Sequence, residues 1–283
     1  MNSSPMRHTM ASNLAETAKA PSAQRLVRHL VLFSGGLVSW AAAKRVIEKH
    51  GTDGVVLLFA DTMMEDEDLY RFITEAAENV GVPLTRIADG RNPWEVMRDE
   101  RIIGGGMTGA DPCSKILKRQ LLNGWTRKNC QPETVQHVGL DWTESHRLDR
   151  MRIRMPECKL SAPMTEAPYL TKPQMMEWLK REGIEPPRLY KMGFPHNNCG
   201  GFCIKAGQAH FELLLRMMPD RYAHHEQKEE EMRQMLEKDY AVLREQRDGK
   251  KYPLTLRKLR ERIQSQGTFD QFEWGGCGCA IDA

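Results

Sequence analysis

Hydrophobic and polar residues form alternating blocks along the first half of the chain. Short apolar runs that suit buried strands are separated by longer segments rich in helix-forming residues. The pattern predicts strands at 30–33, 54–60, 83–88 and 135–140, and helices at 39–49, 66–79 and 114–125. Such alternation is typical of an α/β fold, with a doubly wound, mostly parallel sheet and helices on both faces. Ligands of these folds bind beyond the carboxyl ends of the strands.

The second half of the chain is expected to be mainly helical. Helices are predicted at 172–182, 208–217 and 221–245, and an irregular segment rich in proline and glycine surrounds Cys199. We therefore divide the chain into four parts: a flexible tail at 1–27, an α/β domain at 28–155, a mainly helical region at 156–266 that contains a cysteine site, and a cysteine–glycine tail at 267–283.

Composition narrows the class of protein. The chain has 283 residues, of which 40% are hydrophobic and 28% charged, as in ordinary soluble globular proteins. No apolar run approaches the ~20 residues that cross a bilayer, so we expect no membrane association. Seven cysteines without a secretory signal indicate a reducing, cytoplasmic location and favour metal or redox use over disulfides.

Charge gives a weaker signal about partners. The formal net charge is +3, which by itself does not indicate nucleic-acid binding. Local basic runs occur at Lys250–Lys251 and along 257–262. They are either the solvated face of a helix or a strip that contacts a phosphate backbone.

A glycine turn follows the first predicted strand. Phe33 ends the apolar run, Ser34, Gly35 and Gly36 form the turn, and a helix is predicted from Ser39. Glycines let a ligand approach the main chain, and the N–H groups and dipole at a helix start favour a phosphate. The turn lacks the lysine of a Walker loop and the third glycine of the dinucleotide fingerprint. It has the form of an anion cradle.

Polar residues also end the second predicted strand. Asp61 and Thr62 leave the apolar run, and a cluster of acids follows. Helix capping explains most of that cluster, but Asp61 belongs to the strand end and could position a nucleotide or Mg²⁺. Because parallel strands end at one edge of a sheet, Asp61 and Ser34 can share a pocket.

Cysteines mark a second chemical centre. Cys199 and Cys203 flank glycines that would let the backbone fold around a cluster, and Cys113 would add a third thiolate. Zinc is an alternative, with His196 or His210 as fourth ligand. The three cysteines are otherwise buried small hydrophobic residues.

The C-terminal tail carries two more cysteines among glycines. Cys277 and Cys279 could act as mobile nucleophiles, provide a cluster ligand or receive persulfide sulfur.

The glycine turn resembles the PP-loop, the SGGxDS signature of ATP pyrophosphatases. Ser34, Gly35, Gly36 and Ser39 match it, whereas Val38 stands where that family has aspartate. Other segments, in chain order, resemble elements of 3′-phosphoadenosine-5′-phosphosulfate (PAPS) reductases and related proteins. These segments are 61–72, the cysteine-led 113–118, 139–147 with Asp141 in place of arginine, and 187–199. The likeness extends from residue 30 to about 205.

This resemblance implies cleavage of ATP between its α and β phosphates and transfer of AMP to an acceptor. It also implies Mg²⁺ and a [4Fe–4S] cluster held by Cys113, Cys199 and Cys203. The residues expected to bind nucleotide are Phe33, Ser34, Gly35, Gly36, Ser39, Asp61, Thr62, Gly139 and Arg147. Those expected to take part in catalysis are Ser34, Ser39, Asp61, Cys277 and Cys279.

The leading functional hypothesis is therefore an ATP pyrophosphatase that adenylates an acceptor for sulfur transfer. The acceptor would be nucleic acid, either tRNA or the DNA backbone as phosphorothioate. A cysteine desulfurase as sulfur donor and a homodimeric state are compatible with this reading.

Two alternatives stay open. One is reduction of PAPS or adenylyl sulfate to sulfite, which Asp141 and the altered tail disfavour. The other is a nucleotide- or cluster-binding regulator without turnover, which Val38 favours.

Overall fold

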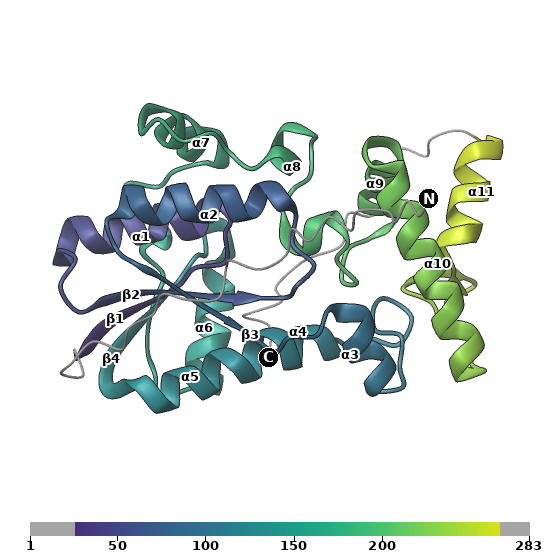
Figure 1. Ribbon diagram of the computed structural model, residues 1–283, viewed down its shortest axis with the longest axis horizontal. Helices are drawn as coiled ribbons and strands as arrows, with labels where there is room; N and C mark the ends of the chain where they lie inside the picture. Colours follow the sequence, from purple (N-terminus) through teal and green to yellow (C-terminus); the bar gives the residue numbers. More distant parts are fainter. Residues whose placement is uncertain (1–25, 267–283) are drawn as a thin grey trace, which may run out of the picture.

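The computed structural model describes residues 26–266 and shows an α/β fold built on a five-stranded, all-parallel sheet (Figure 1). The strands run in the order β3-β2-β1-β4-β5. Their bounds are β1 Val27–Leu32, β2 Val55–Asp61, β3 Leu84–Ala88, β4 Cys130–Val138 and β5 Lys159–Ser161. The predicted parallel sheet is thus confirmed, and the chain order reverses on either side of β1. Ligand-binding crevices of open α/β sheets lie at such a reversal.

Helices cover both faces of this sheet. On one face lie α1 (Leu37–His50), α2 (Glu67–Val80) and α7 (Lys172–Arg181), which share one apolar core with the strands. The opposite face is covered by α5 (Leu121–Asn129) and α6 (Ser145–Arg154). Figure 1 shows the two layers above and below the sheet.

Strand β1 lies at the centre of the sheet because its second half, Leu30 to Leu32, is apolar on both faces. Val31 packs into the core under α1 and α2, whereas Leu30 packs beside α5, and neither is exposed. Side chains alternate between the two faces of a strand, so a continuous apolar run is what a doubly covered strand needs. This explains why the strand could be predicted from the sequence.

A second apolar core joins the helices that follow the sheet. It contains side chains from α3 (Pro93–Asp99), α9 (Gln208–Met217), α10 (Pro219–Leu236) and α11 (Leu256–Gln266). Figure 1 shows α9, α10 and α11 beyond the end of the sheet, next to α3. The short helix α8 (Arg188–Lys191) lies between α7 and α9 along the chain.

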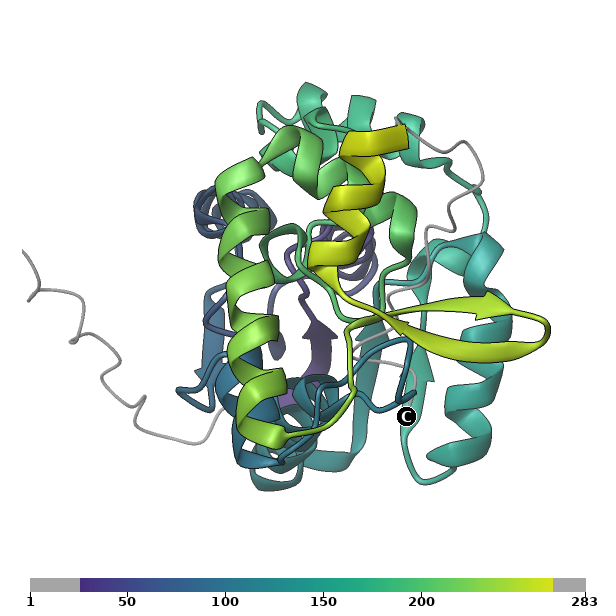
Figure 2. The same cartoon turned by 90° about the vertical axis from the view of Figure 1, so that its right-hand side faces the viewer.

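The prediction of one helix over 221–245 was wrong. Helix α10 ends at Leu236, where Glu237 adopts a left-handed backbone with φ 52°. An antiparallel hairpin follows, formed by β6 (Leu243–Arg247) and β7 (Lys250–Leu254) (Figure 2). Asp248 and Gly249 both have positive φ, as a two-residue hairpin turn of this twist requires. In the part of the chain that is described, no helix is long and apolar enough to cross a membrane.

Candidate functional site

The glycine turn lies between the end of β1 and the start of α1. Gly35 is buried with φ 75°, and a Cβ there would lie 2.9 Å from Ile73 Cγ2. The Ser34 hydroxyl donates to Ser39 Oγ at 3.2 Å, and Ser39 Oγ donates to the Gly36 carbonyl oxygen at 2.8 Å. These two hydrogen bonds stabilise the turn. Ser34 is also exposed to solvent.

Gly139 lies against this turn, at the end of the neighbouring strand β4. A Cβ on Gly139 would lie 2.8 Å from Ser39 Cα and 2.9 Å from its backbone nitrogen. Glycine is required here because two backbones meet, and this contact places the end of β4 beside the predicted phosphate cradle. Arg147 is farther along, on α6, where its guanidinium pairs with Glu144.

Asp141 has a structural partner close by. Its carboxylate accepts a hydrogen bond from the Thr143 backbone N–H at 2.9 Å and caps the short helix that follows. Asp141, which stands in place of the expected arginine, is therefore the N-cap of a short helix.

Asp61 is fully buried at the end of β2 and has cationic and neutral partners. Its Oδ1 accepts hydrogen bonds from the Met63 backbone N–H at 2.8 Å and from the Tyr70 hydroxyl at 2.9 Å. Its Oδ2 pairs with the guanidinium of Arg86 on β3. Burial and the Asp61 charge raise the pKa of Tyr70. A Mg²⁺ ion on Asp61 would have to displace Arg86, so this carboxylate does not fit a metal in the described arrangement.

Glu65 is a buried carboxylate that the sequence analysis attributed to helix capping. It accepts hydrogen bonds from the Thr62 hydroxyl at 2.9 Å and from the Cys199 backbone N–H at 2.6 Å. Lys118 Nζ lies 3.9 Å from its Oε1. Burial raises the pKa of Glu65. Capping does hold for Asp66, whose Oδ1 accepts from the Asp68 N–H at 3.1 Å.

The three predicted cysteines meet at one cavity. Cys113, Cys199 and Cys203 are buried, and all three line a space of about 10 Å³ together with Ser114 and Lys118. Cys113 lies in the short α4 (Pro112–Ser114), and Cys199 has a left-handed backbone with φ 51°. Three cysteines from segments far apart in the chain therefore line one cavity, whereas their role as metal ligands stays a prediction.

The cavity is lined by three cysteine thiols, the ligand type of iron–sulfur clusters. A tetrahedral zinc ion with Zn–S bonds of about 2.3 Å would require the cysteine sulfur atoms to lie roughly 3.8 Å from one another. Within residues 26–266, no group of three or more Cys, His, Asp or Glu is arranged to hold a single metal ion. Three buried thiols suit an iron–sulfur cluster, and the cavity would have to widen to admit one.

The two histidines weighed as zinc ligands lie beside each other. The rings of His196 and His210 stack with centroids 4.9 Å apart, and His210 Nε2 is 2.8 Å from the Gly201 carbonyl oxygen. Burial lowers the pKa of His210 to about 4, which keeps it neutral. Cys277 and Cys279 lie outside the described residues.

One segment connects the cysteine cavity to the glycine turn. The Asn197 side-chain amide donates to the Gly35 carbonyl oxygen at 2.8 Å, and both groups are buried. The Tyr190 hydroxyl accepts from the Leu37 backbone N–H at 3.4 Å. Burial raises the pKa of Tyr190 to about 12, so it stays a neutral phenol. Cys199 follows Asn197 by two residues, and the two centres are thus joined directly.

The basic run at 257–262 is largely ion-paired. Arg257 and Arg260 both contact Glu226 on α10, and Arg262 pairs with Glu245 on β6. This arrangement favours a packing role for the run over a phosphate-contact strip. Lys250 and Lys251 on the hairpin are exposed.

Comparison with known proteins adds nothing to these observations. No protein-family model matches the sequence, and a search of curated proteins gives no match either. Function is therefore argued from the geometry and chemistry of the site.

Proposed function

We propose that the chain is an ATP pyrophosphatase of the PAPS reductase-like group that adenylates an acceptor for sulfur transfer. The acceptor is a nucleic acid, either tRNA or the DNA backbone. The observation that carries this proposal is the hydrogen bond from Asn197 to the Gly35 carbonyl oxygen. It attaches the segment with Cys199 and Cys203 to the turn that is suited to phosphate.

The chemistry divides between these two centres. The N–H groups at the start of α1 and the exposed Ser34 hydroxyl bind the phosphates of ATP. An acceptor oxygen attacks the α phosphate, pyrophosphate leaves with the bond's electron pair, and a sulfur nucleophile then displaces AMP. Cys113, Cys199 and Cys203 would hold a [4Fe–4S] cluster, which supplies sulfur or redox chemistry when bound.

The first test is iron content after anaerobic purification. We expect absorbance near about 400 nm and about four iron per chain, both lost in Cys199→Ser. Cys158→Ser is the matched control, because Cys158 lies outside the cavity and packs beside α6. A colourless wild-type protein without iron would remove the cluster from the proposal.

ATP turnover tests the proposed adenylation step. We expect the wild-type protein to release AMP and pyrophosphate when an acceptor oligonucleotide is present. A regulator without turnover is the second candidate, favoured by Val38 at the start of α1 and by the Arg86 guanidinium on Asp61. The regulator would bind ATP without releasing pyrophosphate, and Val38→Asp would then produce a large gain in ATP cleavage.

A further inference from the structure

An open pocket lies where the β2–α2 loop, α8 and the start of α10 meet. Its volume is about 620 Å³, within the usual range of small-molecule sites. The side chains that line it include four methionines, which are Met64, Met192, Met217 and Met218. Thioethers are flexible and make favourable contacts with aromatic rings. The lining thus suits a flat, apolar body.

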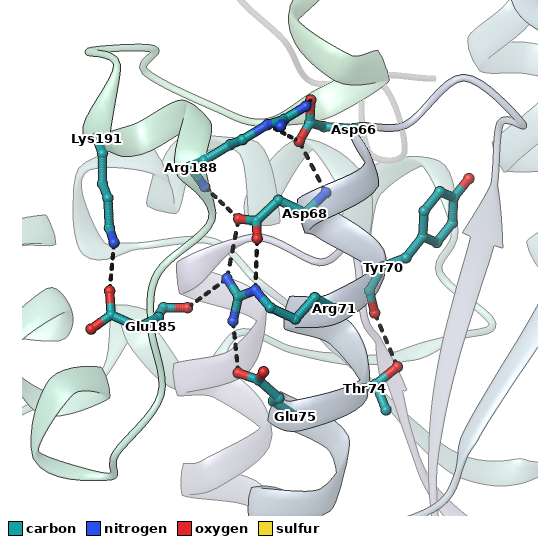
Figure 3. Close-up of polar contacts among 9 residues, drawn as sticks. All are labelled: Asp66, Asp68, Tyr70, Arg71, Thr74, Glu75, Glu185, Arg188 and Lys191. Carbon is teal, nitrogen blue, oxygen red and sulfur yellow. Dashed lines mark hydrogen bonds and ion pairs between the residues drawn. The ribbon is translucent and has the colours of Figure 1, made fainter.

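One wall of the pocket carries two arginines, Arg188 and Arg221. Asp66 forms ion pairs with both arginines. Arg188 Nε lies 2.7 Å from Asp66 Oδ1, and Arg221 Nη1 lies 2.9 Å from Asp66 Oδ2. Figure 3 shows Arg188 extending from α8 to Asp66. Two guanidinium groups therefore share one carboxylate, whose side chain is 2% exposed, while the arginines are 40% and 25% exposed. Asp220 and Glu65 also line the pocket, so anion binding rests on the donors of the two guanidinium groups and not on the net charge of the lining.

The two partly exposed guanidinium groups on this wall offer hydrogen-bond donors to an anionic ligand. The planar guanidinium presents donors in a fork that matches phosphate oxygens. Arg221 is held further by a 2.6 Å hydrogen bond from its Nη1 to the Gly200 carbonyl oxygen, so its position is fixed before a ligand arrives. Preorganised donors of this kind lower the entropic cost of binding.

The pocket also reaches the cysteine cavity. Cys199 lines both the open pocket and the small cavity that it shares with Cys113 and Cys203. Glu65 lines the pocket as well, where it accepts the Cys199 backbone N–H. A ligand in the pocket would therefore lie against the wall that carries the thiol.

We propose that this pocket binds a nucleoside phosphate, with the base against the methionines and the phosphate on Arg188 and Arg221. The ligand is either a free nucleotide or one nucleotide of a single strand. Its identification as the sulfur acceptor rests on the proposed function, whereas the binding itself does not.

The test measures binding of a fluorescently labelled thymidine oligonucleotide to the full chain by anisotropy, with thymidine monophosphate as competitor. Arg221→Gln should weaken binding, but it also removes the bond to Gly200. The sharper test compares two substitutions of opposite charge at Met217, which lines the pocket and is 42% exposed. Met217→Glu should weaken binding and Met217→Lys should strengthen it, each by about threefold to fivefold for one charge near a phosphate.

Met235 provides the matched control, because it is 41% exposed on α10 and does not line the pocket. Met235→Glu and Met235→Lys should leave binding unchanged at physiological salt, where charges are screened beyond about 8 Å. Competition by the monophosphate identifies a free nucleotide as sufficient ligand, whereas binding of the strand alone identifies a strand site. Absence of binding, or equal effects at Met217 and Met235, overturns the proposal.

The outcomes also separate this inference from the proposed function. If pyrophosphate is released but the two Met217 substitutions have no effect, only the pocket assignment is wrong. If the two Met217 substitutions change binding as expected but no pyrophosphate is released, the pocket assignment is supported and the proposed reaction is wrong.

Discussion

The side-chain amide of Asn197 donates a hydrogen bond of 2.8 Å to the carbonyl oxygen of Gly35, 162 residues away in the sequence. Gly35 is in the left-handed region with φ 75°, and a Cβ added there would lie 2.9 Å from Ile73 Cγ2. The hydrogen bond therefore fixes the position of the cysteine-bearing segment relative to the turn. Both groups are buried, so a missing partner would leave an unsatisfied carbonyl.

We expect Asn197→Ala to destabilise the protein by about 1–3 kcal/mol and to weaken ATP binding. Urea unfolding and calorimetric titration with ATP measure the two effects. Asn129→Ala is the control, since the Asn129 amide also donates to a backbone oxygen, that of Trp125 at 2.7 Å, but within α5. It should change stability only. Equal loss of ATP affinity in both variants would mean that Asn197 has no special relation to the turn.

Gly139→Ala should destabilise the protein and displace the turn. The added Cβ would lie 2.8 Å from Ser39 Cα, and overpacking of this kind costs about 1–3 kcal/mol. Gly124→Ala is the matched substitution, because Gly124 lies within α5 and a Cβ there meets nothing within 4 Å. It should raise stability by about 0.5–1 kcal/mol. The free energy of unfolding of both variants is measured in urea. If Gly139→Ala left it unchanged, β4 and α1 would be able to move apart at no cost.

The features that could be predicted from the sequence depend on local patterns. The apolar run of β1 and the glycines after it identify a buried strand and its turn without reference to the rest of the chain. The glycines between Cys199 and Cys203 marked that segment as a candidate ligand site, and the structure places both cysteines with Cys113 around one cavity.

Two features that the sequence did not reveal have different causes. Glu65 looks like one more acid of the cluster at the start of the predicted helix, and only the folded chain brings the Cys199 N–H, 134 residues later, to its carboxylate. The hairpin was hidden by dense charges that also suit an exposed helix. The signal that could have found it is Asp248-Gly249, a pair typical of two-residue hairpin turns.

Acid should weaken the fold through His137. Burial lowers the pKa of His137 to about 3, and its Nε2 lies 3.0 Å from His29 Nδ1. The unfolded chain binds a proton near about pH 6.5, so the stabilising contribution is complete above that value and is lost as the pH falls toward 3. Between about pH 7.5 and about pH 5, the loss from this group is about 2 kcal/mol.

The pH dependence is measured by urea unfolding at the two pH values. His137→Gln should lose about 2 kcal/mol less than the wild type over this range. A residual dependence remains from the buried His210 and His225, whose pKa values burial lowers to about 4 and about 3. His146→Gln, at an exposed position, should follow the wild-type curve. A His137 variant that loses as much stability as the wild type would contradict the assignment.

Glu229 on α10 should be required for the hairpin that the sequence did not reveal. Its side chain, 1% exposed, accepts the Val242 N–H at 2.8 Å and the Leu256 N–H at 2.6 Å, one on each side of the hairpin. Glu229→Ala leaves both buried N–H groups without an acceptor, so we expect a loss of about 2–5 kcal/mol in urea unfolding. Hydrogen exchange at Val242 and Leu256 should rise with it. The exposed Glu231→Ala on the same helix should change stability by less than about 1 kcal/mol. If Glu229→Ala behaved like Glu231→Ala, the hairpin would be held by its apolar contacts alone.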